Sequence, residues 1–197
     1  MVKGNQVKKP VMLLFDFMNL FYRSLHVNKE LYFANEFTGA LYGVAMQIAA
    51  TLNVVRPKIA IVCKDTKPYF RTNDYPEFKA NRKRSQDSVS QKMISGSLKQ
   101  CDELFQLIGL PVLQAVGMEA DDLIAAQVKL NNPDWKIVVA SNDSDLYQLF
   151  TVPDFRLYKG KQKGFYAKGD FMEDYDGLSP KDWIEVIALT GGHNSLP

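Results

Sequence analysis

Cysteine and histidine are scarce in this 197-residue chain, which contains two of each. Cys63 and Cys101 cannot build a disulfide framework, so the sequence favours a reducing, cytoplasmic compartment. His26 and His193 are too few and too isolated for a histidine-based mechanism, and no Cys/His cluster suggests zinc. Long apolar runs are absent as well: none approaches the roughly 20 residues of a membrane span, and the N-terminus lacks the apolar core of a signal peptide. We therefore expect neither export nor a membrane partner.

The composition is that of an ordinary globular protein, with 46% hydrophobic and 23% charged residues. Its length suits one sizeable domain. The net charge of +2 is unevenly distributed, because residues 56–99 carry eleven Lys/Arg against four Asp/Glu and the remainder carries thirteen against eighteen. This asymmetry suggests that one region holds a polyanion while the other holds cations. The simpler interpretation of the basic region is a solvated charged loop.

Short apolar runs that end in an acid recur along the chain. Residues 11–17, 58–65 and 135–145 each have this design, and 110–116 reads as a further strand. Helical patterns separate or follow these runs, at 39–52 after Thr38 as a candidate cap, 97–109, 119–130 and 179–191. Residues 155–160 and 164–169 look like a weak hairpin. The alternation predicts an α/β fold with a mostly parallel central sheet and helices on both faces.

Seven carboxylates fall at the ends of four of the predicted strands: Asp16, Asp65, Glu119, Asp121, Asp122, Asp143 and Asp145. Because ligands bind at the carboxyl ends of parallel strands, we expect these acids to converge. Each has a simpler explanation alone, since carboxylates favour a first helical turn and Asp143 would serve as an N-cap. Together they would repel one another, and divalent cations would relieve that repulsion. Hard oxygen ligands suit Mg²⁺ or Mn²⁺, and two such ions about 4 Å apart can activate water at a phosphodiester.

Residues 66–96 interrupt the alternation with a polar, basic stretch that is long for a connection within a domain. It carries four aromatic residues among its charges: Tyr69, Phe70, Tyr75 and Phe78. Such a loop can hold a phosphate backbone and stack on unpaired bases. Acids that bind metals beside a basic aromatic loop indicate a phosphodiesterase acting on nucleic acid.

Five stretches make the pattern more specific: "LLFDFMNLFYRSLH", "TGALYGV", "CKDTKPYFRTNDYPEFKANR", "GMEADDLIAA" and "SNDSDLYQL". In these stretches the chain resembles the 5′ nuclease family, which includes flap endonucleases, the 5′ nuclease domains of bacterial DNA polymerases and stand-alone phage 5′–3′ exonucleases. The resemblance implies a PIN-like 5′ nuclease core over residues 1–190. It also implies a helical arch or flexible loop insertion at about 66–96, which we call the arch segment.

The resemblance also assigns roles to individual residues. Asp16, Asp65, Glu119 and Asp121 would surround a first metal ion, with Asp122 reaching it through water. Asp143 and Asp145 would serve a second, with Asp121 shared. Lys79 and Arg82 would face the scissile phosphate and stabilise the transition state electrostatically, while metal-bound water acts as the nucleophile. Further nucleic-acid contacts are expected from Tyr22, Arg71, Lys83 and Arg84.

The last motif departs from the family pattern. "TGGHNSLP" (190–197) has Gly192 where the family has a metal-binding aspartate, so we expect a weakened second site, with His193 as an alternative ligand. The family continues into a helix–hairpin–helix region that grips duplex DNA. Residues 191–197 would be the start of that region, truncated or missing here and completed by a further C-terminal region or a separate chain.

The sequence thus predicts a divalent-metal-dependent 5′–3′ exonuclease or flap endonuclease. Its partners would be DNA with 5′ ends or flaps, in replication, repair or degradation in a bacterial or phage-infected cytoplasm. Two rivals stay open: an RNA-directed 5′ nuclease with RNase H-like activity on an RNA/DNA hybrid, and a catalytically weakened nucleic-acid binding protein. Retention of all seven acids argues against the second rival, because a pure binder gains nothing from a repulsive cluster.

Overall fold

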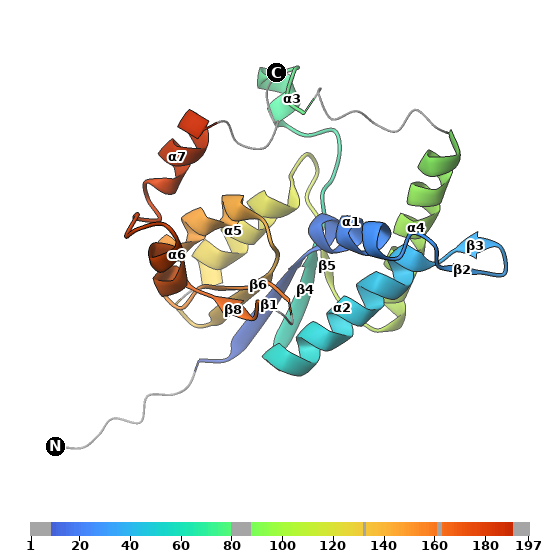
Figure 1. Ribbon diagram of the computed structural model, residues 1–197, viewed down its shortest axis with the longest axis horizontal. Helices are drawn as coiled ribbons and strands as arrows, with labels where there is room; N and C mark the ends of the chain where they lie inside the picture. The colour runs from blue at the N-terminus through green and yellow to red at the C-terminus, as the bar shows by residue number, and fades with distance from the viewer. Residues whose placement is uncertain (1–8, 80–87, 132, 161–162, 191–197) are drawn as a thin grey trace.

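The computed structural model describes residues 9–79, 88–131, 133–160 and 163–190. Its main sheet has the strand order β5-β4-β1-β6-β7-β8 (Figure 1). All neighbouring strands are parallel except the last pair, β7 and β8. The strands are β1 (Val11–Asp16), β4 (Ile59–Cys63), β5 (Val112–Leu113), β6 (Lys136–Ala140), β7 (Arg156–Tyr158) and β8 (Phe165–Tyr166). The predicted mostly parallel α/β sheet is therefore confirmed, together with the hairpin near its end.

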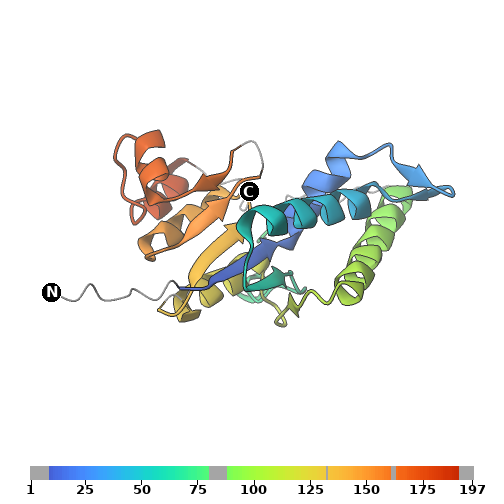
Figure 2. The ribbon, with the colours of Figure 1, turned by 90° about the horizontal axis from the view of Figure 1, so that it is seen from below.

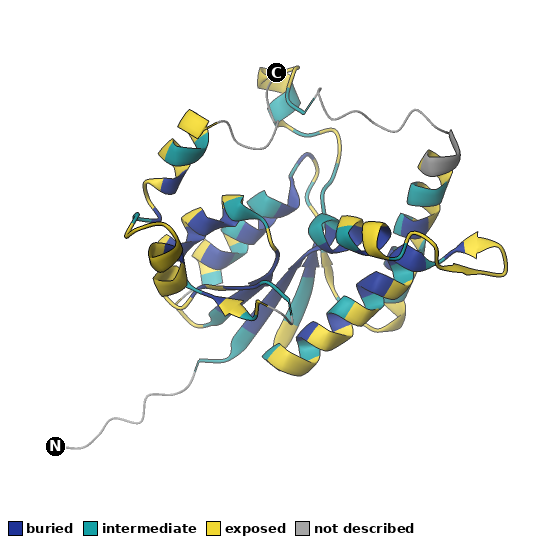
Figure 3. Ribbon diagram, in the orientation of Figure 1, coloured by how far each residue is buried: buried dark blue, intermediate teal, exposed yellow. Residues whose placement is uncertain are grey.

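Helices cover both faces of this sheet, so the central strand β1 is buried on both sides. Met12 and Leu14 of β1 pack into one hydrophobic cluster, and Leu13 and Phe15 into the other. The helices of the first cluster are α5 (Ala120–Asn131), the 3-10 helix η1 (Ser144–Thr151), α6 (Lys168–Asp174) and α7 (Trp183–Thr190). Those of the second are α1 (Phe17–Val27), α2 (Gly39–Val55) and α4 (Ser88–Leu107). Figure 2 shows the two helical layers from below, and Figure 3 shows the buried strands between them.

Several element boundaries differ from the predicted ones. Helix α4 begins at Ser88, inside the arch segment, although apolar periodicity predicts a start only at residue 97. The short helix α3 (Arg71–Asp74) also lies in that segment, so its described parts are largely helical. Residues 80–87 lie outside the described chain. Thr38 stands at the N-cap of α2 but its hydroxyl makes no cap bond and instead donates to the carbonyl of Leu31.

Two smaller features complete the fold. Strands β2 (Tyr32–Phe33) and β3 (Glu36–Phe37) form a separate antiparallel pair between α1 and α2. None of the helices in the described ranges is long and apolar enough to cross a bilayer. The arrangement leaves the carboxyl ends of β1, β4 and β6 side by side, with α3 beyond them (Figure 1).

Candidate active site

Three adjacent parallel strands deliver acids to one edge of the sheet. Asp16 is the last residue of β1, Asp65 follows β4 by two residues, and Asp143 follows β6 by three. β1 lies between the other two strands, so these carboxylates meet at the same edge. The structure thus brings together the acids of these three segments, as expected from the position of ligand sites in parallel sheets.

Asp16 is buried at this edge, with 5% of its surface exposed. Its carboxylate accepts hydrogen bonds from the Ser141 hydroxyl over 2.7 Å and from the backbone N–H of Asn19 over 3.2 Å, which caps α1. Burial raises the pKa of Asp16 to about 6 despite these two bonds, with further repulsion from Asp143 and Asp65. The site therefore holds Asp16 in a fixed position without neutralising its charge.

Asp121 lies in the first turn of α5 and has the most perturbed carboxyl of the site. Burial raises its pKa to about 8, and the negative charges of Asp16, Asp143, Glu119 and Asp65 add to the effect. No hydrogen bond or ion pair to its side chain occurs within the described ranges. Like charges around an uncompensated carboxylate are the arrangement in which a bound cation relieves the most repulsion.

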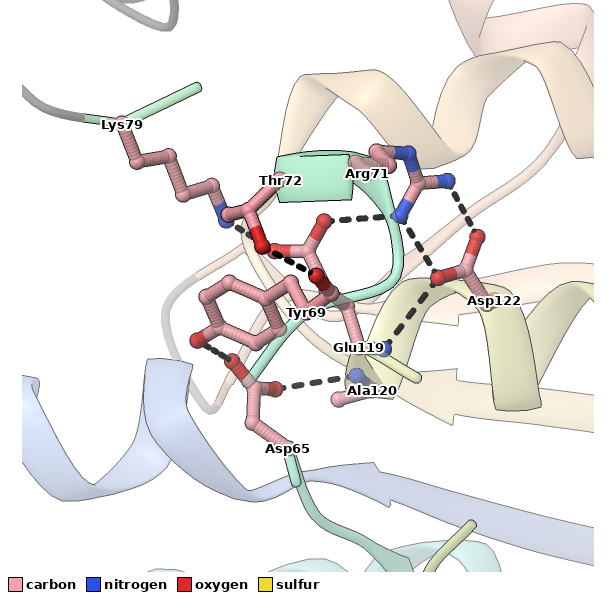
Figure 4. A network of polar contacts seen from close by, with 8 residues as sticks. All are labelled: Asp65, Tyr69, Arg71, Thr72, Lys79, Glu119, Ala120 and Asp122. Carbon is pink, nitrogen blue, oxygen red and sulfur yellow. Dashed lines mark hydrogen bonds and ion pairs between the residues drawn. The ribbon is translucent and has the colours of Figure 1, made fainter. Parts of the chain in front are cut away.

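Glu119 and Asp122 lie in a different environment, because cations of the arch segment pair with them (Figure 4). Arg71 binds Asp122 through both terminal nitrogens, over 2.7 and 2.5 Å, and also donates to Glu119 over 2.8 Å. Lys79 donates to the other oxygen of Glu119. The hydrogen bond from Arg71 lowers the pKa of Asp122. These two acids are therefore neutralised within the chain.

Asp65 joins the arch segment to the start of α5. Its two oxygens accept from the Tyr69 hydroxyl over 2.7 Å and from the backbone N–H of Ala120 over 2.9 Å (Figure 4). The backbone of Phe70 donates to the carbonyl of Gly117 over 2.9 Å. Gly117 has a φ of +77°, and a Cβ there would lie 3.3 Å from the backbone nitrogen of Phe70, so a side chain would strain this close approach. The base of the arch segment is thus fixed to the acidic loop.

The geometry also limits what the acids can do without movement. No group of three or more His, Cys, Asp or Glu side chains in the described ranges lies close enough to hold a metal ion. The donors are all hard carboxylate oxygens, which fits Mg²⁺ or Mn²⁺ chemically. A divalent cation would require the side chains to rotate together, and Glu119 to leave Lys79 and Arg71. The expected complete ligand set is therefore not preassembled.

Of the remaining predicted site residues, three lie within the described chain and five lie outside it. Asp145 is exposed, and its backbone N–H donates to Asp143, which caps η1 as an N-cap. Tyr22 is 44% exposed on α1, with its ring against the edge of Phe21. Arg71 faces the acids rather than an open surface. Arg82, Lys83, Arg84, Gly192 and His193 lie outside the described residues, so their predicted roles stay predictions.

Two residues that contact the acids have little signal in the sequence. Ser141 follows β6, and its hydroxyl both donates to Asp16 and accepts from the backbone of Asp143, tying the first acid to the last. Tyr69 combines its bond to Asp65 with a ring 5.1 Å from the Lys79 ammonium. Serine and tyrosine are common at strand ends and in basic loops, so only the folded contacts identify them.

Two curated relatives resemble most of the chain. The thermostable DNA polymerase I of Thermus aquaticus is 29% identical over 188 residues, which cover 94% of this chain and 22% of that protein. A 5′-3′ exonuclease of Buchnera aphidicola is 28% identical over 157 residues, covering 78% of this chain and 52% of that protein. The chain therefore spans a fifth to a half of the curated relatives.

Solved structures show the same fold. The zinc-bound 5′-exonuclease of bacteriophage T5 superposes with a TM-score of 0.72 at 25% identity, covering 90% of this chain and 65% of that one. The T5 flap endonuclease in a pseudo-enzyme-product complex with DNA and metal ions gives 0.73 at 24% identity, covering 92% and 66%. A family model described as "5'-3' exonuclease, N-terminal resolvase-like domain" matches residues 11–176. The chain belongs to this 5′–3′ exonuclease family.

Proposed function

We propose that the chain is a divalent-metal-dependent 5′–3′ exonuclease and flap endonuclease that hydrolyses DNA phosphodiesters. The single observation that carries this proposal is that Asp16 and Asp121, buried at the carboxyl edge of the sheet, have raised pKa values because burial and neighbouring acids disfavour their ionised forms and no cation of the described residues pairs with them. In most folded proteins, a nearby cation or hydrogen bonds to the ionised form lower the pKa of a structural carboxylate. Here burial and the neighbouring acids raise both pKa values instead, so a bound cation would be the partner that stabilises the two ionised forms.

Asp16, Asp65, Asp121 and Asp143 would hold the metal ions, since they come from four segments and already repel one another. When bound, the ions would supply activation of water and neutralisation of charge on the phosphate. One of the T5 neighbours is bound to zinc and the other to DNA with metal ions, which supports divalent ions at such a site. Mg²⁺ or Mn²⁺ is the choice that matches the all-oxygen donors here.

The residues of the chain itself would position the phosphate. Lys79 and Arg71 are the cations nearest to the acids, and both stand on the rings of the arch segment, with Arg71 4.8 Å from Phe70 and Lys79 5.2 Å from Phe78. A phosphodiester entering between them and the carboxylates would compete for both cations. Their hydrogen bonds would then move from Glu119 to the phosphate and stabilise its developing charge.

A second candidate function is nucleic-acid binding with weakened cleavage. One observation favours it: Arg71 and Lys79 neutralise Glu119 and Asp122 and so compete with a metal ion for them. If these ion pairs persist in the complex, two acids are withdrawn from the predicted ligand set. The basic arch segment would then bind a strand without efficient hydrolysis.

DNA with 5′ ends or flaps is the proposed substrate, in replication, repair or degradation within a bacterial or phage-infected cytoplasm. The deciding experiment offers 5′-labelled duplex, flap, single-stranded DNA, RNA/DNA hybrid and RNA to the protein with Mg²⁺, Mn²⁺ or a chelator. Release of short 5′ products from DNA only with metal would support the proposal. Preferential cleavage of the RNA strand would replace it with the RNA-directed function. Chelator-insensitive binding without cleavage in any metal would support the binding function.

A further inference from the structure

A pocket lies beside the carboxyl edge of the sheet, and its lining residues have no role in the mechanism proposed above. It has a volume of about 600 Å³ and lies between α1, α2 and the loops that follow β6 and β7. Its walls include Arg23, Tyr42, Met46, Gln47 and Asn142. None of its lining residues in the described ranges is acidic. Pockets of this size suit a small ligand or a unit of a polymer.

Arg23 is the feature of this pocket that most requires a ligand. Its guanidinium is partly buried and has no carboxylate partner among the described residues. Instead it donates to the Gln47 oxygen and, with the Asn142 amide turned so that its oxygen faces the guanidinium, to that oxygen over 2.6 Å. Burial lowers the pKa of Arg23, which is the effect of leaving a positive charge uncompensated. Arginine nevertheless stays charged in proteins, with donors directed in a planar fork that fits phosphate.

The surrounding contacts hold that guanidinium in place. Gln47 donates to the Ser24 hydroxyl over 2.6 Å, which leaves its oxygen directed at Arg23. In the same orientation the Asn142 nitrogen donates to the carbonyl of Lys159 over 3.3 Å, which directs its oxygen at Arg23. At Gly43 a Cβ would lie 2.6 Å from the Ser24 side chain, so α1 and α2 can approach this closely only because a glycine stands there. Two amides on different elements thus orient one cation.

The pocket is also adjacent to the catalytic acids. The backbone N–H of Asn142 donates to the side chain of Asn19, and its neighbour Ser141 donates to Asp16. A separate small cavity is lined by both Arg23 and Ser141. A strand whose phosphate lies at the acids could therefore extend its neighbouring nucleotides into the pocket.

Exposed apolar side chains also line the pocket. Tyr42 and Met46 lie one turn apart on α2 and are 52% and 53% exposed. An aromatic face next to a cation is the pairing that single-strand binding sites use, because bases stack on the ring while the cation contacts the backbone. We infer that this pocket binds a nucleotide of a single-stranded DNA segment, with a phosphate on Arg23 and the base against Tyr42. The inference rests on the proposed function only for the class of ligand.

The test measures binding of a fluorescent 12-nucleotide oligo(dT) by anisotropy in chelator, over a series of salt concentrations. Arg23→Gln should weaken binding about tenfold and reduce the salt slope by about 0.7, the value for one phosphate contact on a single strand. Lys58→Gln is the matched control, since it removes an exposed cation directly before β4, at the end of that strand away from the acids. It should change affinity less than twofold.

Two further variants separate contact from architecture. Gln47→Ala breaks the link between α1 and α2 but keeps the charge, so it should weaken binding less and leave the salt slope unchanged. Tyr42→Ala, at an exposed position, should weaken binding of oligo(dT) at least fivefold but leave an abasic oligomer unaffected. The inference would be overturned if Arg23→Gln bound oligo(dT) with the parental affinity. It would also be overturned if Arg23→Gln and Gln47→Ala lost the same affinity and neither changed the dependence of affinity on salt.

The outcome is separable from that of the proposed function. Because the binding assay contains no metal, Arg23-dependent binding can be found in a chain that cleaves nothing, which would remove the proposed function alone. Metal-dependent cleavage with unaltered binding in the Arg23 and Tyr42 variants would remove the inference alone. Competition by inorganic phosphate as strong as by the oligomer would show a free-anion site and also overturn it.

Discussion

Asp121 and Asp122 are neighbours in the first turn of α5, yet their carboxyl groups experience opposite electrostatic environments. Burial and four surrounding acids raise the pKa of Asp121 to about 8, whereas the hydrogen bond from Arg71 lowers the pKa of Asp122. The helix dipole and the local sequence are nearly the same for both. The difference therefore comes from the side of the helix each residue occupies: Asp121 faces the strand ends and Asp122 faces the arch segment.

This contrast divides the acidic cluster into two groups. The uncompensated group, Asp16 and Asp121 with their neighbours Asp65 and Asp143, lies along the carboxyl edge of the sheet. The paired group, Glu119 and Asp122, faces Arg71 and Lys79. A chain that needed only to be stable would pair all of them, because unpaired buried charges oppose folding. The uncompensated group is thus the part whose neutralisation must come from outside the chain.

The largest expected effect comes from Asp121→Asn. This change should abolish metal-dependent cleavage by orders of magnitude, because it removes the central negative charge of the uncompensated group. Without metal it should stabilise the fold. A carboxyl pKa raised from about 4 to about 8 destabilises the folded state increasingly as pH rises through that range. Because each pKa unit corresponds to about 1.4 kcal/mol, the gain in the free energy of unfolding should reach several kcal/mol at pH 8.

Chemical denaturation of parent and Asp121→Asn in chelator, from pH 4 to pH 8, measures this directly. The gain in the free energy of unfolding should be small at pH 4 and largest at pH 8. A gain independent of pH, or a loss at every pH, would mean that Asp121 is compensated in the folded protein. Circular dichroism would establish that the inactive variant is folded.

Lys79→Ala tests the paired group at its second cation. Cleavage should fall about 100-fold under single-turnover conditions, a typical effect of removing one electrostatic stabiliser of a transition state. Binding should change much less. Lys92→Ala is the control, because Lys92 is an exposed basic residue on α4. Equal effects of the two substitutions on the single-turnover rate would reject a special role for Lys79.

Asp143 and Asp145 provide a smaller contrast within the second predicted metal site. Asp143→Asn should reduce cleavage at least tenfold more than Asp145→Asn, because Asp143 interacts electrostatically with Asp16 and Asp121 whereas Asp145 is exposed. Asparagine can still accept the N-cap bond, so the fold should persist. Mg²⁺ titrations of both variants check this. Similar metal requirements and rates would show that Asp145 turns inward with the ion.

The sequence predicts the frame of the site because the frame depends on local patterns. The runs ending at Asp16, Asp65 and Asp143 have a continuous apolar stretch followed by an acid, and each becomes a strand of the parallel sheet. Parallel pairing then places their ends together whatever the loops do.

The division of the cluster could not be predicted. Arg71 lies 48 residues before Glu119, and nothing in the pattern of the arch segment distinguishes it from other basic residues. Backbone hydrogen bonds from Thr66 to Met118 and from Phe70 to Gly117 bring it to the acids in the folded chain. The predicted start at residue 97 was wrong, because α4 begins at Ser88 and Met93 and Ile94 already pack against the core. The position of a polar pair separated by a long loop depends on packing, which a local pattern does not contain.

The smallest expected effect belongs to Asp122→Asn, and it should have the opposite sign from Asp121→Asn. A carboxyl with a lowered pKa stabilises the folded state above its unfolded value near pH 4, and this contribution is lost as pH falls through the lowered pKa. Arg71 is one-third exposed and keeps its contact to Glu119, so the loss at pH 7 should be only about 1 kcal/mol. That corresponds to a Tm lower by roughly 3 °C in a domain of this size. Thermal melts of the two asparagine variants at pH 3, 5 and 7 should therefore diverge as pH rises, and parallel curves would mean that the two carboxyls are not electrostatically distinct.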